Sequence, residues 1–492
     1  MGATRVSRII RTVYLIAVGL GVAALGSVQS RAADLTTLVS FCAQTNCTGM
    51  NIIWTLNTDA DGNLFGTTKV GGAMNAGTVF EVEKTAEGYA STPTILYSFC
   101  AQTNCTDGST PLTTLVADAD DNLFGTAVFG GAHGDPNNGG VVFELANTAA
   151  GYSFIPLVSF CLQAGCTDGA LPNGLVADID GNLFGTTQQG GANGSGTVFE
   201  IEKTATGYAS TPTILYSFCA QTNCADGSRP EWGVIIDRNG NLFGTTRFGG
   251  ANGSGTVFEI ANTASGYSFS TLVTFGAECA GGGCSFGGLV ADAVDNLFGI
   301  TIFMGAPQGS SGKVFEVAKT ATGFASTPTI LYSFCAQTNC ADGDGPNNLM
   351  VDTVGNLFGT TIRGGANGQG TAFELAKTGS GYASSPAILH SFCAQTNCGD
   401  GAAPNLGLAA DNGGHLFGTT FSGGANNGGT VFEVGGGGFI GSFIGTPGSH
   451  NCRGKTVSAL EQRFGTLDAA ATALRFPDGD ALQNAIADFC AG

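Results

Sequence analysis

The sequence predicts an all-β fold, a seven-bladed β-propeller whose blades each contain four antiparallel strands. Three observations predict it: a segment of about 60 residues recurs seven times, the first six copies each contain four strand signals, and the seventh lacks the fourth. Successive copies lie 59, 60, 59, 55, 60 and 59 residues apart, a fixed period that indicates a repeat architecture. The phenylalanine of each Leu-Phe-Gly core marks one copy: Phe65, Phe124, Phe184, Phe243, Phe298, Phe358 and Phe417.

The third copy shows the four strand signals clearly. Residues 174–178 form a short apolar run, 183–187 read Leu-Phe-Gly-Thr-Thr, 197–201 alternate, and 213–218 end in Tyr-Ser-Phe. Turns rich in Asp, Gly and Asn separate them, and short β-branched or aromatic runs between turns are typical of an all-β protein. A linear β-solenoid is the alternative, although its rungs are usually shorter.

The two ends of the repeat region predict how the ring closes. The seventh copy runs from Thr430–Val434 directly into four glycines, so it has no fourth strand of its own. Residues 35–41 copy the fourth strand and residues 42–47 copy its cysteine loop, so we expect the strand 35–41 to complete the last blade. Closure removes exposed strand edges. Residues 439–443, Phe-Ile-Gly-Ser-Phe, also resemble a fourth strand and are the alternative.

The terminal segments differ from the repeats. Residues 1–32 read as a signal peptide, with three arginines before an apolar run at 12–26 and small residues before the expected cleavage point. An uncleaved anchor is the alternative, but the run is short for a spanning helix. We expect a propeller over 33–437, a glycine-rich linker over 438–447 and a small α-helical domain over 448–492, where Ser458–Glu461 forms a capping box.

Sixteen cysteines predict a disulfide framework. Fourteen form C-x4-C pairs, one in each repeat, and the last two bracket the predicted helical domain. An even count beside an export signal is typical of disulfides. A zinc site is the alternative, but it needs four ligands, and the four histidines do not follow the cysteine pairs. The expected pairs are Cys42/Cys47, Cys100/Cys105, Cys161/Cys166, Cys219/Cys224, Cys279/Cys284, Cys335/Cys340, Cys393/Cys398 and Cys452/Cys490.

Composition limits the classes of partner that the protein is expected to bind. The 492 residues include 80 glycines and carry a formal net charge of −19, with only 18 lysines and arginines. Nucleic acids are bound through clustered cations, so we expect no nucleic-acid partner. We also expect no metal, no cofactor and no membrane span after the signal peptide is removed.

The repeat motif resembles a known family. Asp-x-x-Gly-Asn-Leu-Phe-Gly-Thr-Thr, then Gly-Gly-Ala-Asn-Gly-x-Gly-Thr-Val-Phe-Glu, then Ile-Leu-Tyr-Ser-Phe is similar to the GloVer tandem repeat of bacterial extracellular proteins, which carry varied anchoring ends. The resemblance covers about residues 35–434. It implies an exported bacterial repeat protein, extracellular or at the cell surface, with the periplasm as an alternative. It implies no activity, so no functional residue is transferred. The cysteine loops and the helical end depart from the family.

Features shared by all seven copies indicate fold rather than function, because one active site does not need seven copies. We expect the repeat phenylalanines to pack between blades. The Asp-x-Asp-Gly-Asn turns resemble the start of a calcium loop but lack its later bidentate glutamate, so they predict hairpin turns. A glutamate follows the phenylalanine of each third strand. Together the seven could form an acidic ring that binds cations, but we favour a structural role in which each carboxylate accepts hydrogen bonds within the blades. These glutamates are Glu81, Glu144, Glu200, Glu259, Glu316, Glu374 and Glu433.

Residues that do not repeat are the candidates for binding. In an antiparallel blade the loops after the second and fourth strands fall on one face, and there the copies differ most. Variable residues on rigid loops are typical of binding sites, although ordinary loop drift is the alternative. Aspartates that occur in only five cysteine loops belong to the same face: Asp107, Asp168, Asp226, Asp342 and Asp400. The candidate binding residues are His133, Arg229, Glu231, Trp232, Phe303 and Arg363.

These patterns predict a secreted binding or surface-structural module without catalysis, whose ligand is an extracellular glycan or protein. The alternative is an extracytoplasmic glycan hydrolase or lyase, because propellers also carry enzymes and fold alone does not decide function. Such an enzyme should show a non-repeated cluster of carboxylates or histidines near the central channel.

Overall fold

The structure is a computed structural model that describes residues 34–42, 50–52, 55–59, 61–132, 139–276, 285–302, 311–353, 355–404, 406–411 and 414–435. The chain divides into two compact units, Met1–Ala32 and Ala33–Gly492. Every described residue belongs to the second unit. The predicted signal peptide, glycine-rich linker and helical domain therefore lie outside the described residues.

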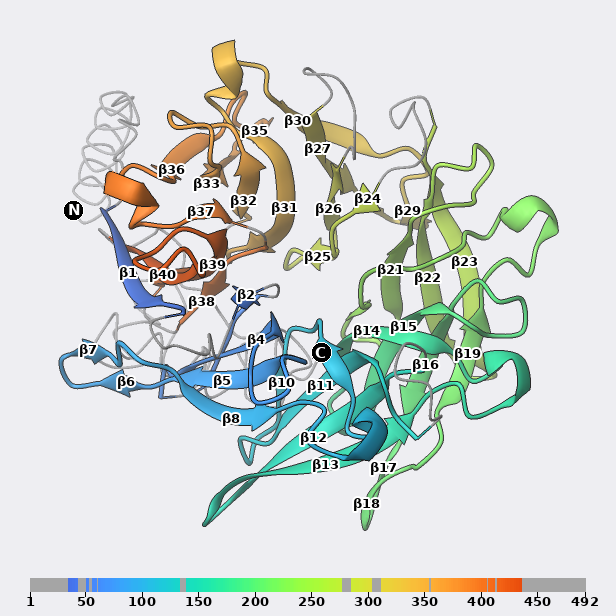
Figure 1. The fold of residues 1–492 in the computed structure, drawn as a ribbon. Helices are drawn as coiled ribbons and strands as arrows, with labels where there is room; N and C mark the ends of the chain where they lie inside the picture. Colours follow the sequence, from blue (N-terminus) through green and yellow to red (C-terminus); the bar gives the residue numbers. More distant parts are fainter. Residues whose placement is uncertain are drawn as a thin grey trace, which may run out of the picture. The chain divides into compact units, whose positions relative to one another are not determined.

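Seven antiparallel sheets form the seven blades and stand around a common centre (Figure 1). Blade 1 contains β2 (Met50–Ile52), β3 (Asn57–Thr58), β4 (Leu64–Val70), β5 (Thr78–Val82) and β8 (Thr94–Ser98). Blade 2 contains β9 (Ser109–Pro111), β10 (Val116–Ala117), β11 (Leu123–Phe129), β12 (Val141–Thr148) and β13 (Gly151–Ser159). Blades 3 and 4 contain β14 (Ala170–Ala177), β15 (Leu183–Gln189), β16 (Thr197–Ile201) and β19 (Thr213–Ser217), then β20 (Ile235–Ile236), β21 (Leu242–Thr246), β22 (Thr256–Thr263) and β23 (Gly266–Thr274).

The remaining blades follow the same order. Blade 5 contains β24 (Ser285–Phe286), β25 (Val290–Ala291), β26 (Leu297–Ile302), β27 (Ser311–Val317) and β30 (Thr329–Phe334). Blade 6 contains β31 (Asp344–Val351), β32 (Leu357–Arg363), β33 (Thr371–Leu375) and β36 (Ala387–Ser391). Blade 7 contains β37 (Ala402–Pro404), β38 (Ala409–Ala410), β39 (Leu416–Ser422), β40 (Thr430–Gly435) and β1 (Asp34–Ser40). The predicted seven-bladed propeller is confirmed.

Short elements connect the blade strands. Four two-stranded hairpins join third and fourth strands: β6 (Lys84–Thr85) with β7 (Gly88–Tyr89), β17 (Lys203–Thr204) with β18 (Gly207–Tyr208), β28 (Lys319–Thr320) with β29 (Gly323–Phe324), and β34 (Lys377–Thr378) with β35 (Gly381–Tyr382). In blades 2 and 4 this hairpin continues the ladder of the blade itself, which makes β12, β13, β22 and β23 longer. Single 3₁₀ turns lie in the cysteine loops: η1 (Thr103–Cys105), η2 (Ala164–Cys166), η3 (Thr222–Cys224), η5 (Thr338–Cys340) and η6 (Thr396–Cys398).

Blade 7 is assembled from both ends of the repeat region. β1 pairs antiparallel with β40, in a register that runs from Asp34 opposite Gly435 to Ser40 opposite Thr430. Figure 1 shows the blue β1 beside the orange β40. Blade 7 then contacts blade 1, where the Thr58 hydroxyl donates to the Ala410 carbonyl at 3.2 Å. The alternative closing segment, residues 439–443, lies outside the described residues.

The Leu-Phe-Gly core has a direct steric explanation. The glycine lies under the ring of the third-strand phenylalanine, and a Cβ added at Gly66 would lie 2.6 Å from Cζ of Phe80. The same clash, at 2.4–2.8 Å, occurs in every blade, so only glycine lets the ring lie flat on the second strand. The seven glycines are Gly66, Gly125, Gly185, Gly244, Gly299, Gly359 and Gly418.

The phenylalanine of the Leu-Phe-Gly core packs across a blade boundary, as the sequence predicts. Phe417 of blade 7 meets Tyr89 of blade 1 at 5.4 Å between ring centroids. Such aromatic pairs add specific geometry to apolar burial. Five other boundaries repeat this contact: Phe65 with Tyr152, Phe124 with Tyr208, Phe184 with Tyr267, Phe243 with Phe324, and Phe298 with Tyr382. Within the described residues, no helix is long and apolar enough to cross a membrane.

Candidate functional site: the axial cavity

The innermost strands of all seven blades surround a cavity of about 730 Å³. This volume lies within the range of small-molecule binding sites. Each blade contributes the segment that leads into its Asp-Gly-Asn turn, so the cavity follows the axis of the ring. The lining segments are 55–59, 114–118, 175–177, 235–238, 289–293, 348–353 and 408–411.

The wall of the cavity is mostly apolar, with a few polar groups. Val116, Ile236 and Met350 are examples of the aliphatic side chains that innermost strands contribute. Asn348 also lines the cavity, and among the described residues its buried Oδ1 has no hydrogen-bond partner. This oxygen faces Gly288 of the neighbouring blade and is closed off from solvent, so it belongs to the packing between blades and not to the open surface of the cavity.

A ring of aspartates ends the innermost strands. In blade 1, the backbone N–H of Asn63 donates to Oδ1 of Asp59 at 2.8 Å and its side-chain amide donates to Oδ2 at 2.7 Å. Five other turns repeat both bonds, and in blade 7 His415 stands in place of the asparagine. These aspartates therefore build hairpin turns, and all of them except Asp178 also line the cavity. They are Asp59, Asp118, Asp178, Asp237, Asp292, Asp352 and Asp411.

Two turns depart from the repeat at one position. Five turns have glycine there with φ between 77° and 92°, whereas Asp121 and Asp295 occupy it with φ of 58° and 64°. Aspartate tolerates this left-handed conformation at a modest cost. Both departures line the cavity. They are carboxylates that the turn itself does not require.

The cavity rim is charged unevenly. On one side Arg238 lies 3.7 Å from the Asp295 carboxylate, and it is the one basic side chain among the described lining residues. Asp411 and Asp292 pair with lysines of neighbouring blades, Lys84 and Lys377, each at 3.3 Å.

The side of the rim formed by blades 1 and 2 is different. We call Asp59, Asp118 and Asp121 the acidic rim segment. Within the described part of the chain, no lysine or arginine lies within 4.0 Å of their carboxylates. Burial raises the pKa of Asp121 above its usual value, and aspartates of its own turn and of the blade 1 turn raise it further. Negative charge therefore concentrates here without a cation to offset it.

The seven third-strand glutamates lie away from the cavity wall. None of them is among its lining residues. In five blades burial raises the pKa of this glutamate, and the turn aspartate of the same blade raises it further: Glu81, Glu144, Glu200, Glu316 and Glu374. Among the described residues, no group of three or more His, Cys, Asp or Glu side chains is arranged to hold a metal ion. The glutamates thus add negative charge near the turn aspartates, but within the described residues they do not form a metal-binding group.

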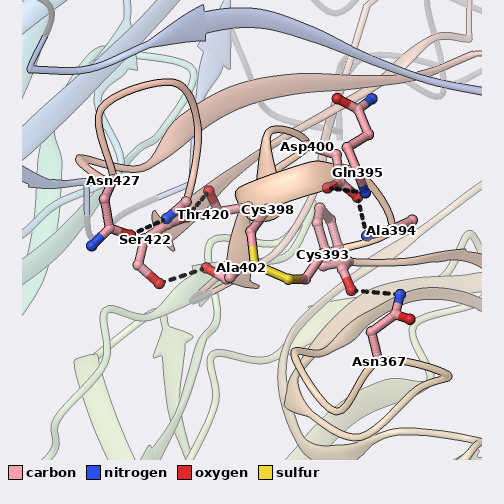
Figure 2. The surroundings of a disulfide bond; sticks show 12 residues. Asn367, Cys393, Ala394, Gln395, Cys398, Asp400, Ala402, Thr420, Ser422 and Asn427 are labelled. Carbon is pink, nitrogen blue, oxygen red and sulfur yellow. Dashed lines mark hydrogen bonds between the residues drawn. A yellow bond between two sulfur atoms is a disulfide. The ribbon is translucent and has the colours of Figure 1, made fainter.

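The cysteine loops are internally fixed. Figure 2 shows the Cys393–Cys398 bond, beside which Asp400 Oδ2 accepts the backbone N–H of Ala394 at 3.0 Å, and Oδ1 accepts that of Gln395. Five described pairs form the predicted disulfides: Cys100–Cys105, Cys161–Cys166, Cys219–Cys224, Cys335–Cys340 and Cys393–Cys398.

The other three predicted disulfides are not tested by the structure, because at least one cysteine of each pair lies outside the described residues. The cysteines outside this part of the chain are Cys47, Cys279, Cys284, Cys452 and Cys490. The pairs Cys42/Cys47, Cys279/Cys284 and Cys452/Cys490 therefore stay predictions.

The five loop aspartates were expected on the variable binding face, and the structure corrects this interpretation. All five are buried, with Asp168 the most exposed at 4%. Each accepts backbone N–H groups of its own cysteine loop, and in three blades a tyrosine hydroxyl donates to it as well. Carboxylates held by several donors are structural acceptors. They organise the loop and do not face a ligand.

The predicted binding residues are only partly gathered. Arg229, Glu231 and Trp232 lie together in blade 4, where Glu231 forms a 2.7 Å ion pair with Arg247. The guanidinium groups of Arg229 and Arg247 lie 5.9 and 5.0 Å from the centroid of the Phe248 ring.

The other predicted binding residues do not join this group. Arg363 stands apart in blade 6, is 63% exposed and pairs with Asp344 at 3.1 Å. His133 and Phe303 lie outside the described residues. Sequence reasoning missed the rim residues Asp121, Arg238 and Asp295. An aspartate at the glycine position of a repeated turn was the signal that could have found two of them.

The closed ring and its axial cavity define a β-propeller repeat protein. Residues 136–341 match the family model described as the Gloeobacter/Verrucomicrobia repeat. Residues 136–341 thus carry this repeat, and the resemblance to the GloVer repeat is confirmed over that segment.

Many solved structures are similar to the chain, and two of them serve as examples. A luciferin-regenerating enzyme shares 13% identity, covers 67% of this chain and 93% of its own, and has a TM-score of 0.37. A puromycin-hydrolyzing peptidase of Mycobacterium tuberculosis shares 10% identity over 76% of this chain and 50% of its own, with a TM-score of 0.42. At such values neither likeness bears on function. No curated protein sequence matches the chain.

Proposed function

We propose that the chain is an exported bacterial binding protein without catalytic activity, and that it holds its ligand in the axial cavity. The observation that carries this proposal is the cavity itself, of about 730 Å³ and lined by residues of every blade. The repeat family and the five described disulfides support a place outside the cytoplasm.

The innermost strands suit a preformed site. Each strand ends at an aspartate turn fixed by two hydrogen bonds, and the glycine–phenylalanine contact fixes the strand beside it. A rigid site loses little conformational entropy when a ligand binds. The blade 4 group around Arg229 is a weaker candidate, because Glu231 is already paired with Arg247.

A bulky side chain inside the cavity tests the site. Ala291 lines the cavity and is exposed, so Ala291→Trp fills part of the space without disturbing the packed core. Ala192→Trp, on an exposed loop of blade 3 outside the lining, is the matched control. Calorimetry with a panel of oligosaccharides, peptides, organic amines and organic acids should find ligands that bind the wild type and the control but not Ala291→Trp.

Two results would contradict the proposal. Equal binding of every ligand by Ala291→Trp would move the site away from the cavity. Turnover of a panel member, followed by mass spectrometry, would favour the hydrolase or lyase alternative. Export is tested separately by sequencing the amino terminus of the protein recovered outside the cell, where we expect a start at or near Ala33.

A further inference from the structure

We infer that the axial cavity takes an organic cation, a molecule with an apolar body and an ammonium or guanidinium head that lies against the acidic rim segment. This inference rests on the proposed function, since it requires the cavity to be the binding site. It adds the chemical class of the ligand.

The wall determines the body of the ligand. Aliphatic side chains from innermost strands of several blades, such as Leu115, Val116, Ile236 and Met350, line the cavity. Apolar surface removed from water on both sides favours binding roughly in proportion to its area. A strongly hydrated ligand such as a free inorganic ion or a highly hydroxylated sugar would leave this wall unmatched.

The rim determines the charge of the ligand. Eight aspartates line the cavity against a single described arginine, Arg238, which is already beside Asp295. The carboxylate of Asp121 differs from the turn aspartates, because among the described residues it accepts no hydrogen bond and has no cation within 4.0 Å. A cation bound there would offset a charge that the fold leaves uncompensated.

The same rim disfavours anionic heads. A carboxylate or phosphate ligand would meet the acidic rim segment with like charge.

Three probes that share one apolar body separate the head groups. Octylammonium, octanoate and octyl β-glucoside are titrated into the full-length protein by calorimetry, below the concentrations at which they form micelles. We expect octylammonium to bind about tenfold or more tightly than octanoate, with the glucoside between them. We also expect the affinity for octylammonium to fall as salt rises, because salt screens exposed charges.

Two variants of one turn locate the head. Asp121→Gly restores the residue that five other turns carry at this position, so the variant should fold, and it should weaken octylammonium binding about fivefold or more. Asp120→Asn removes the same charge from an exposed neighbour outside the cavity lining, and its effect should be smaller than about twofold. Octyl glucoside should bind both variants and the wild type alike.

The outcomes distinguish this inference from the proposed function. If octanoate or octyl glucoside binds as tightly as octylammonium and Ala291→Trp abolishes that binding, the cavity is the site but the cationic class is wrong. Equal loss of octylammonium affinity in Asp121→Gly and Asp120→Asn would contradict a head at Asp121. If none of the three probes binds the wild type, the inference is overturned, and the ligand panel with Ala291→Trp still decides the proposed function.

Discussion

Single residues of the Leu-Phe-Gly motif explain why it recurs. The glycine has ordinary extended backbone, so it is present for space and not for an unusual φ. The ring of the third-strand phenylalanine occupies the place of its side chain. A motif shared by every blade thus records one packing contact made seven times.

Replacing one of these glycines should destabilise the protein. A Cβ at Gly244 would lie 2.5 Å from Cζ of the buried Phe258, so Gly244→Ala overpacks the core and should lower the free energy of unfolding by about 1–3 kcal/mol. Gly379 is exposed and has nothing within 4 Å, so Gly379→Ala should be close to neutral. Urea denaturation followed by tryptophan fluorescence measures both. Equal midpoints would contradict the steric explanation.

His415 gives the closing blade a pH-sensitive contact. A hydrogen bond to Asp411 raises the pKa of His415, and its Nδ1 lies 2.9 Å from the Asp411 carboxylate. A raised pKa in the folded state means that the stabilisation is complete below the unfolded pKa and is lost as pH rises through the folded pKa. Because this histidine is half exposed, the effect should be small.

The variant His415→Asn tests this contact with the residue found in the other six turns. The wild type should lose thermal stability relative to the variant as pH rises from about 6 to about 8, the range in which histidine loses its proton. Thermal unfolding across that range measures the difference. Parallel curves for the two proteins would show that His415 adds no pH dependence.

At the scale of elements, the strands could be predicted and the loops could not. Four strand signals per copy, separated by Asp-Gly-Asn turns, are local features that sequence shows directly. The role of Asp226 is not local in this sense, because its partner Tyr216 belongs to the strand that precedes the loop. Because the loop aspartates occur in only some copies, the sequence suggested that they belong to a binding surface. The structure shows instead that they are buried acceptors of hydrogen bonds.

Some features of the cavity rim could likewise be predicted from the sequence, and others could not. Asp121 could be singled out by comparing one turn position across the seven copies, since glycine is usual there. Its place beside the blade 1 turn could not be predicted, because that proximity exists only in the closed ring. The ion pair between Arg238 and Asp295 joins two neighbouring blades, so no regular spacing in the sequence reveals it.

Removing a loop aspartate should cost more than removing an exposed one. Asp226→Ala leaves the Tyr216 hydroxyl and the backbone N–H groups of Ala220 and Gln221 without their acceptor, and should lower stability by roughly 2–4 kcal/mol. Asp180→Ala, at an exposed turn position, should change it by less than about 0.5 kcal/mol. Thermal unfolding under oxidising conditions compares them, and similar values would restore the loop aspartates as surface residues.

For the whole molecule, stability depends on one non-local strand pairing. β1 is separated from β40 by almost the whole propeller in sequence, yet the two complete blade 7. Val39 is 1% exposed and lies opposite Val431 in this ladder. The last blade therefore forms only when the chain has returned to its start.

A charge in this strand should open the ring. Val39→Asp buries an unpaired carboxylate and should lower the free energy of unfolding by about 2 kcal/mol or more. Thr36→Asp adds the same charge at an exposed position of the same strand and should have little effect. Limited proteolysis should cut the Val39→Asp protein early within blade 7. Equal protease resistance in both variants would contradict the closing role of β1.

The pairing of Asp34 with Gly435 has a further consequence for the connectivity of the fold. Paired strands lie about 5 Å apart, so a few added residues are enough to join these two positions directly. The propeller is then suited to circular permutation, with new ends opened in an exposed hairpin such as the one between β17 and β18. Such a permutant would carry blade 7 as one uninterrupted segment and turn the long-range closing step into a local hairpin.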